Sequence, residues 1–210
     1  MIVIEEVCKR FKEKEVLNHV SLKMEKGKIY GIVGRNGSGK TVLMKCICGF
    51  LYPDSGTITV NGKEIGKDMD FLEDAGIIIE TPGFISHYTG MQNLKNLASI
   101  QGKIGKEKIR ETMELVGLDP ENHTPVGKYS LGMRQRLGIA QAIMEDPDIL
   151  ILDEPMNGLD KHGVKDIREL LLKLKAQGTT MLMASHNRED IEVLCDHVWE
   201  MDEGVATQVR

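Results

Sequence analysis

One short segment constrains the fold of this chain more than any other. Residues 34–41 read Gly-Arg-Asn-Gly-Ser-Gly-Lys-Thr and satisfy the pattern G-x-x-x-x-G-K-[ST]. An apolar run at residues 29–33 precedes the segment, and a helix-like stretch at residues 41–48 follows it. A strand, a glycine-rich loop and a helix in this order predict a phosphate-binding loop rather than an ordinary glycine-rich turn.

Each position of this loop has a chemical purpose. The glycines let successive backbone N–H groups curl around a β-phosphate, and the following helix presents its positive end. We expect Lys40 to bridge the β and γ oxygens and to act catalytically, and we expect the Thr41 hydroxyl to ligate Mg²⁺. The expected nucleotide-binding residues of this segment are Gly34, Arg35, Asn36, Gly37, Ser38, Gly39, Lys40, Thr41 and Val42. The expected cofactors are therefore ATP and Mg²⁺.

The apolar pattern of the chain predicts an α/β fold. Runs rich in Ile and Val recur at residues 29–33, 76–79, 149–152 and 180–184. Helix-like stretches such as 41–48 and 164–175 lie between them. This alternation indicates a mainly parallel sheet with helices on both faces.

Two other regions do not show this alternation of strands and helices. Residues 2–7, 16–24 and 57–60 are strand-like and are joined by turns, including Asn61-Gly62, which predicts an antiparallel flank. Between about residues 84 and 142 the strand signals vanish and amphipathic helices are expected, notably at 91–101 and 106–116. We therefore expect a single domain over residues 1–210, with a core of residues 1–83 and 143–210 and an inserted helical lobe at about 84–142.

A second chemical pattern follows the third apolar run, where residues 149–152 lead into Asp153 and Glu154. Ligands bind at the carboxyl edge of a parallel sheet, so both carboxylates are expected near the phosphate loop. We expect Asp153 to hold Mg²⁺ through water and Glu154 to orient and deprotonate the attacking water. In a chain without a phosphate loop, two solvated acids at a strand end would be an equally good interpretation.

The segment at residues 129–136 decides between the many enzymes that share these two patterns. It resembles the signature motif of the ATP-binding cassette (ABC) ATPases, usually L-S-G-G-Q followed by x-Q-R. Ser130, Gly132, Gln135 and Arg136 match this motif, whereas Leu131 and Met133 depart from it. Residues 157–160 resemble the D-loop of the family, and residues 184–186 resemble its switch-histidine segment. The resemblance covers the whole chain and implies a P-loop NTPase with a RecA-like core.

The resemblance also implies roles for residues outside the phosphate loop. Phe11 falls where the family has an aromatic residue that stacks on adenine, although an early Phe is more often a core residue. ATP is clamped between the loop of one subunit and the signature of another, so two chains must pair head to tail, as a homodimer or with a different chain. Ser130 and the helix start near Gly132 would bind the γ-phosphate across this interface, and Asp160 would help to hold the subunits together. His186 would contact the γ-phosphate as a catalytic sensor; a satisfied polar residue at a strand end is the alternative.

One departure is informative. Most transporters of the family have Gln after the central strand, but here Glu80 stands at that position. The sequence around it resembles the branch that includes bacitracin-resistance and lantibiotic-immunity ATPases. This resemblance rests on residues 80–84, 89–90, 93–94, 130–133, 135–140, 154–155 and 157–160. Met156 is a deviation, because Thr is usual at that position. A carboxylate remains a hard oxygen ligand for Mg²⁺, so we expect Glu80 to bind metal and nucleotide and to change turnover or coupling.

Composition limits the partners. The formal charge of -5 comes from 32 acidic and 27 basic residues, which are well mixed, so nucleic acid is not an expected partner. No run of about 18 apolar residues and no signal peptide is visible, which predicts a cytoplasmic chain without direct membrane insertion. The four cysteines are expected to be reduced and mostly buried.

The expected function is ATP hydrolysis that drives export through separate integral-membrane permease subunits, with the chain peripheral on the cytoplasmic face of the membrane. An antimicrobial peptide or drug is the expected substrate class. One alternative is a non-transport ABC ATPase that acts on nucleic acid or the ribosome, although the coiled-coil insertion, zinc module or second cassette usual in such proteins is absent. The other alternative is a nucleotide switch or small-molecule kinase.

Overall fold

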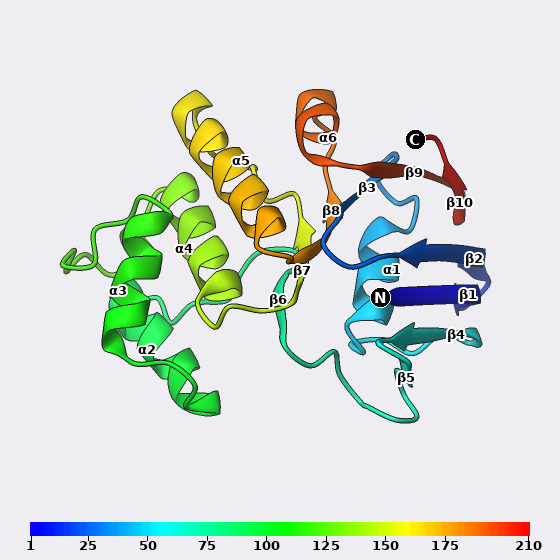
Figure 1. The fold of residues 1–210 in the computed structure, drawn as a ribbon, viewed down its shortest axis with the longest axis horizontal. Helices are drawn as coiled ribbons and strands as arrows, with labels where there is room; N and C mark the ends of the chain where they lie inside the picture. Colours follow the sequence, from blue (N-terminus) through cyan, green and yellow to red (C-terminus); the bar gives the residue numbers. More distant parts are fainter.

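The computed structural model describes residues Met1–Arg210, and a six-stranded sheet forms its centre (Figure 1). The strand order is β10-β9-β3-β8-β7-β6. These strands are β3 (Ile29–Val33), β6 (Ala75–Ile78), β7 (Ile149–Asp153), β8 (Thr180–Ala184), β9 (His197–Asp202) and β10 (Val205–Gln208). All neighbours pair in parallel except β10, which is antiparallel to β9. The predicted mainly parallel sheet is confirmed.

A second sheet contains the N-terminal strands in the order β2-β1-β4-β5, and all of its pairs are antiparallel. Its strands are β1 (Ile2–Phe11), β2 (Lys14–Met24), β4 (Ser55–Val60) and β5 (Lys63–Glu64). Asn61 and Gly62 join β4 to β5 with φ values of 51° and 84°, which is the backbone that a tight Asn-Gly hairpin turn requires. The antiparallel flank is therefore also confirmed.

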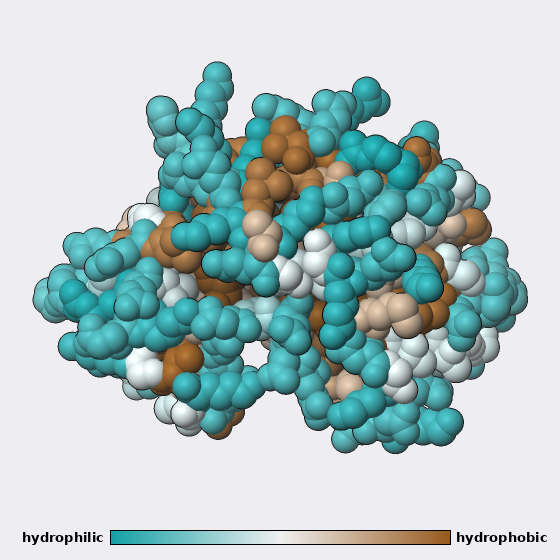
Figure 2. Space-filling view, viewed as in Figure 1, coloured by the Kyte–Doolittle hydropathy of each residue, from teal (hydrophilic) through white to brown (hydrophobic).

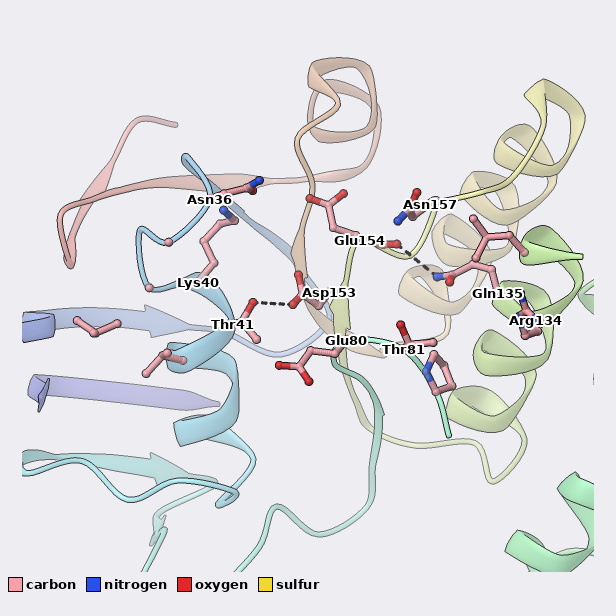
Figure 3. Close-up of a pocket in the computed structure, with 16 residues that line it drawn as sticks. Asn36, Lys40, Thr41, Glu80, Thr81, Arg134, Gln135, Asp153, Glu154 and Asn157 are labelled. Atoms are coloured by element: carbon pink, nitrogen blue, oxygen red, sulfur yellow. Dashed lines mark hydrogen bonds between the residues drawn. The ribbon is translucent and has the colours of Figure 1, made fainter. Parts of the chain in front are cut away.

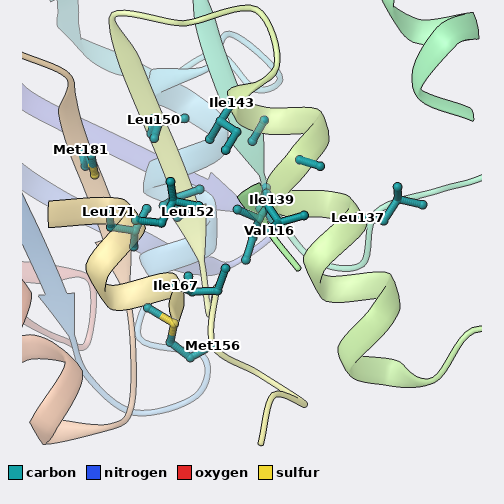
Figure 4. Packing of buried hydrophobic residues seen from close by; sticks show 14 of the residues in the cluster. Val116, Leu137, Ile139, Ile143, Leu150, Leu152, Met156, Ile167, Leu171 and Met181 are labelled. Atoms are coloured by element: carbon teal, nitrogen blue, oxygen red, sulfur yellow. The ribbon is translucent and has the colours of Figure 1, made fainter. Parts of the chain in front are cut away.

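The central sheet is buried on both faces, and its side chains alternate between two hydrophobic clusters. Ile149 and Ile151 of β7 join the cluster that contains helix α1 (Lys40–Ile47) and the antiparallel sheet. Leu150 and Leu152 point to the other cluster, which contains helices α5 (Lys161–Ala176) and α6 (Arg188–Leu194) (Figure 4). A run of four apolar residues is thus explained by burial on two sides.

Three further helices lie beside the sheets: α2 (Gly90–Gln101), α3 (Lys106–Leu115) and α4 (Leu131–Ile143) (Figure 1). A short 3-10 helix, η1 (Val126–Lys128), precedes α4. Thr89 and Gln92 form a capping box at the start of α2, and Gly102 ends it in the left-handed conformation. The C-terminal end of α4 packs directly on β6, because a Cβ on Gly76 would collide with the carbonyl oxygen of Ala142.

The sequence patterns did not predict β5, α6, β9 or β10, and they ended β1 too early.

The surface in Figure 2 is mostly hydrophilic in this view, with small hydrophobic patches between the polar side chains. None of the helices combines the length and the apolar content that a bilayer crossing needs.

Candidate active site

The phosphate loop connects β3 to α1 in a backbone path that only glycine can follow at two points. Gly34 has φ 148°, and a Cβ there would collide with the carbonyl oxygen of Met201. Gly39 has φ 108°, and its Cβ would lie 2.6 Å from the carbonyl oxygen of Val16. L side chains rarely adopt such angles, so these glycines allow the loop to curl tightly before α1 begins at Lys40.

The Thr41 side chain at the end of the loop points toward Asp153 of β7 (Figure 3). Thr41 Oγ1 donates a hydrogen bond of 2.8 Å to Asp153 Oδ2, although 112 residues separate them in sequence. Lys40 Nζ donates to the carbonyl oxygens of Gly34 and Arg35 at 2.7 and 3.0 Å. A hydroxyl and a carboxylate therefore meet beside an ammonium group, and hard oxygen donors of this kind suit Mg²⁺.

A cleft of about 490 Å³ opens between the phosphate loop, β6, β7 and the start of α4. Its lining includes the expected residues Asn36, Gly37, Gly39, Lys40, Thr41, Val42, Glu80, Asp153 and Glu154. Gly34, Arg35 and His186 line an adjoining cleft. Ser38 is buried within the loop, and its Oγ has no hydrogen-bond partner.

Glu154 follows β7 directly and has a positive φ of 51°, which is strained for a non-glycine residue. Its Oε2 lies 2.8 Å from His186 Nδ1, so two of the three expected catalytic side chains are in contact. Gln135 of α4 donates to the carbonyl oxygens of Glu154 and Pro155 at 3.3 and 2.9 Å. These bonds connect the start of α4 to the segment that carries the candidate base.

Glu80 lies at the end of β6, also with positive φ, at 61°. Its Oε1 is 2.6 Å from Lys45 Nζ in the last turn of α1. This ion pair, at the edge of the cleft, has no counterpart in the sequence patterns, because Lys45 belongs to none of the motifs.

Four other expected residues do not line the cleft. Ser130 and Asp160 are helix caps: Ser130 Oγ accepts from Met133 N at 3.1 Å, and Asp160 Oδ1 accepts from Gly163 N at 2.8 Å. Gly132 allows α4 to approach the D-loop, because a Cβ there would lie 2.9 Å from the Gly158 carbonyl oxygen. Phe11 is 44% exposed, which excludes the core alternative.

Sequence reasoning assigned no role to seven residues that line the cleft. They are Val16, Thr81, Pro82, Leu131, Arg134, Gln135 and Asn157. Most of them lie inside or next to a motif, and this position could have identified them. Gln135 belongs to the signature segment, and Asn157 belongs to the segment that resembles the D-loop. Val16 carried no signal, because it comes from β2 of the other sheet.

Known proteins with similar sequences identify the family of this chain. A family model described as "ABC transporter" matches residues 17–157. An uncharacterised ABC transporter ATP-binding protein of Bacillus subtilis, YybJ, is 43% identical over 97% of this chain and 94% of its own length. The bacitracin transport ATP-binding protein BcrA of Enterococcus faecalis is 44% identical over 97% of this chain and 67% of its own length. The lantibiotic transport ATP-binding protein SrtF of Streptococcus pyogenes is 35% identical over 97% of this chain and 88% of its own length.

Solved structures share the fold. A nucleotide-free ATP-binding cassette from an ABC transporter has a TM-score of 0.85 at 27% identity, over 100% of this chain and 91% of that chain. The dimeric bacterial ABC transporter cassette MJ0796 has a TM-score of 0.89 at 22% identity, over 100% of this chain and 99% of that chain. The chain therefore belongs to the ABC transporter ATP-binding family and is an ABC ATPase related to bacitracin and lantibiotic transport ATP-binding proteins.

Proposed function

We propose that this chain hydrolyses Mg-ATP in a head-to-tail pair with a second cassette and thereby drives export through separate membrane subunits. The observation that carries the proposal is the contact between Thr41 and Asp153 in the cleft that Lys40 and Glu154 also line. A hydroxyl and a carboxylate can hold a metal there, and a second carboxylate follows on the same strand to activate water.

The residues fit Mg-ATP in their chemistry. We assign Lys40 and the loop N–H groups to the phosphates, Thr41, Asp153 and Glu80 to Mg²⁺, and Glu154 to the attacking water. When bound, Mg²⁺ would neutralise charge on the β- and γ-phosphates. The glycine geometry at Gly34 supports this assignment, because any larger residue would block the curled loop.

Head-to-tail pairing would explain why Ser130 and Gly132 of the signature segment do not line the cleft of their own chain. Ser130 is exposed at the start of α4 and is free to face another subunit with the positive end of that helix. The relative MJ0796 is dimeric, which supports pairing as a property of similar cassettes. We place Asp160 and Phe11 at this interface and at the adenine, respectively.

A membrane partner and a peptide-like substrate are supported by relatives and by the surface. BcrA and SrtF are named for bacitracin and lantibiotic transport. Phe50 and Phe71 are both exposed, with ring centroids 6.4 Å apart, and clustered exposed aromatic side chains are typical of protein interfaces. We propose a cytoplasmic cassette attached to the membrane through permease subunits that export an antimicrobial peptide or drug.

The test is a Glu154→Gln variant, with the exposed α3 residue Glu111 changed to Gln as a matched control. ATP hydrolysis and particle size by light scattering are measured with and without Mg-ATP. We expect Glu154→Gln to lose turnover and to shift from monomer to dimer with Mg-ATP, while Glu111→Gln hydrolyses ATP like the wild type. Persistent turnover without any ATP-dependent change of size would contradict the proposal and favour a switch or kinase.

A further inference from the structure

The ion pair between Lys45 and Glu80 joins the nucleotide cleft to a helix that carries the phosphate loop. Lys45 Nζ lies 2.6 Å from Glu80 Oε1, and the Lys45 side chain is only 29% exposed. Glu80 lines the same cleft as Thr41 and Asp153, and it begins the segment that leads to α2. One carboxylate therefore pairs with an ammonium group and also lines the cleft that contains the proposed metal ligands Thr41 and Asp153.

The ion pair with Lys45 and the proposed binding of Mg²⁺ compete for the Glu80 carboxylate. An ammonium group at 2.6 Å neutralises the carboxylate, and its positive charge also repels a divalent cation nearby. A glutamine at this position would remain an oxygen donor but would carry no charge for Lys45 to neutralise. The competition arises because this chain has a carboxylate at residue 80.

We propose that Lys45 is a positioning residue that competes with Mg²⁺ for the Glu80 carboxylate and thereby raises the Mg²⁺ concentration needed for tight ATP binding. The inference rests on the proposed Mg-ATP site. Because Glu80 is mostly exposed, solvent weakens the ion pair, and we expect its removal to change the Mg²⁺ requirement by only about two- to fivefold.

A purely structural role for Lys45 predicts a different result. A cation in the last turn of α1 also compensates the negative end of the helix. If that were its whole contribution, removing the charge would lower thermal stability and leave the Mg²⁺ requirement of nucleotide binding unchanged.

The experiment is a double-mutant cycle with Lys45→Met, Glu80→Gln and the double variant in the full chain. Binding of a fluorescent ATP analogue is titrated with Mg²⁺, and thermal unfolding is recorded for each protein. Lys108→Met is the matched control, because Lys108 is 35% exposed and pairs with Asp146 at 2.7 Å. Lys45→Arg, which retains the ion pair, is expected to behave like the wild type.

We expect Lys45→Met to lower the half-saturating Mg²⁺ concentration about two- to fivefold, and to have no such effect in the Glu80→Gln background. An unchanged Mg²⁺ requirement in Lys45→Met, or an equal decrease with Glu80→Gln present, would overturn the inference alone. A wild-type chain that binds the analogue without any dependence on Mg²⁺ would overturn the proposed function as well. The two failures are thus distinguishable.

Discussion

His186 Nδ1 lies 2.8 Å from Glu154 Oε2, and the register of two strands brings these residues together. Asp153 at the end of β7 pairs with Ala184 at the end of β8. The residues that follow each strand therefore emerge side by side at the carboxyl edge of the sheet, where α/β proteins bind ligands. Glu154 also has a positive φ of 51°, a strained backbone conformation of the kind that clusters at functional sites.

Replacing His186 with Ala is expected to lower kcat about 100-fold with little change in ATP affinity, because the candidate base loses its hydrogen-bond partner. Steady-state hydrolysis and nucleotide binding measure the two effects separately. His123→Ala, a change at an exposed histidine before η1, serves as the control. Equal kcat values for the two variants would remove His186 from the catalytic site.

Thr41 permits a test of a single oxygen atom. Thr41→Val keeps the shape of the side chain but removes the hydroxyl that contacts Asp153, so we expect about a 100-fold loss of Mg²⁺-dependent hydrolysis. Thr41→Ser keeps the hydroxyl and is expected to stay within about fivefold of the wild type. Hydrolysis rates across a Mg²⁺ titration distinguish them. If serine and valine were equally impaired, packing rather than the hydroxyl would explain the effect.

The sheet and the motif positions could be predicted because each depends on local sequence. A run such as 149–152 is apolar on both faces, and the acids that follow it must emerge at the sheet edge. In contrast, β9 mixes buried residues with the polar His197 and Glu200, so it carries no apolar run. Helix α6 has only seven residues, which is too short for a periodic pattern.

The Lys45–Glu80 ion pair is a part of the site that the sequence could not predict. Glu80 could be identified by its position after a strand, but the direction of its side chain depends on a positive φ of 61°. Its partner Lys45 lies on α1. The phosphate-loop motif predicts where this helix begins in the sequence, but it does not predict how the helix is oriented. Ion pairs of this kind emerge only when packed elements fix two side chains at the same point.

Gly76 is expected to be essential for packing between α4 and β6. Gly76→Ala would force the helix away from the strand, because the added methyl group collides with the Ala142 carbonyl oxygen. We expect a loss of about 1–3 kcal/mol in the free energy of unfolding, measured by urea denaturation. Gly83→Ala is the control, since no atom lies within 4 Å of its added Cβ. Equal stability of both variants would show that α4 can shift without cost.

Three buried cysteines provide a pH-dependent prediction. Burial raises the pKa of Cys46 to about 11 and the pKa values of Cys48 and Cys195 to about 12, from an ordinary 9.0. The unfolded chain therefore releases these protons at lower pH than the folded chain, so the free energy of unfolding falls as pH rises above about 9. We expect urea midpoints to decrease from pH 8 to pH 10. A Cys46→Ala variant should show a shallower decrease if these thiols cause the effect.

Asp190 is expected to contribute more to stability than its neighbour Glu189, although both carboxylates bind Arg168. Asp190 is 1% exposed, lies 2.6 Å from Arg168 Nη2 and accepts a hydrogen bond from Ser185 Oγ at 3.2 Å. Glu189 is 69% exposed and lies 3.0 Å from Arg168 Nη1. Removing Asp190 leaves the largely buried Arg168 cation with only the exposed Glu189 as a partner, so Asp190→Ala should lower the free energy of unfolding by about 3–5 kcal/mol.

Glu189→Ala is the matched control, and its loss should be much smaller because water screens an exposed pair. Asp190 also accepts a hydrogen bond from Ser185, the residue before His186, so a small rearrangement there would reach His186, the proposed partner of the candidate base. We therefore expect Ser185→Ala to lower kcat while the urea midpoint changes little. A Ser185→Ala variant with wild-type kcat would show that the Arg168–Asp190 pair stabilises the packing of α5 against α6 and does not affect catalysis.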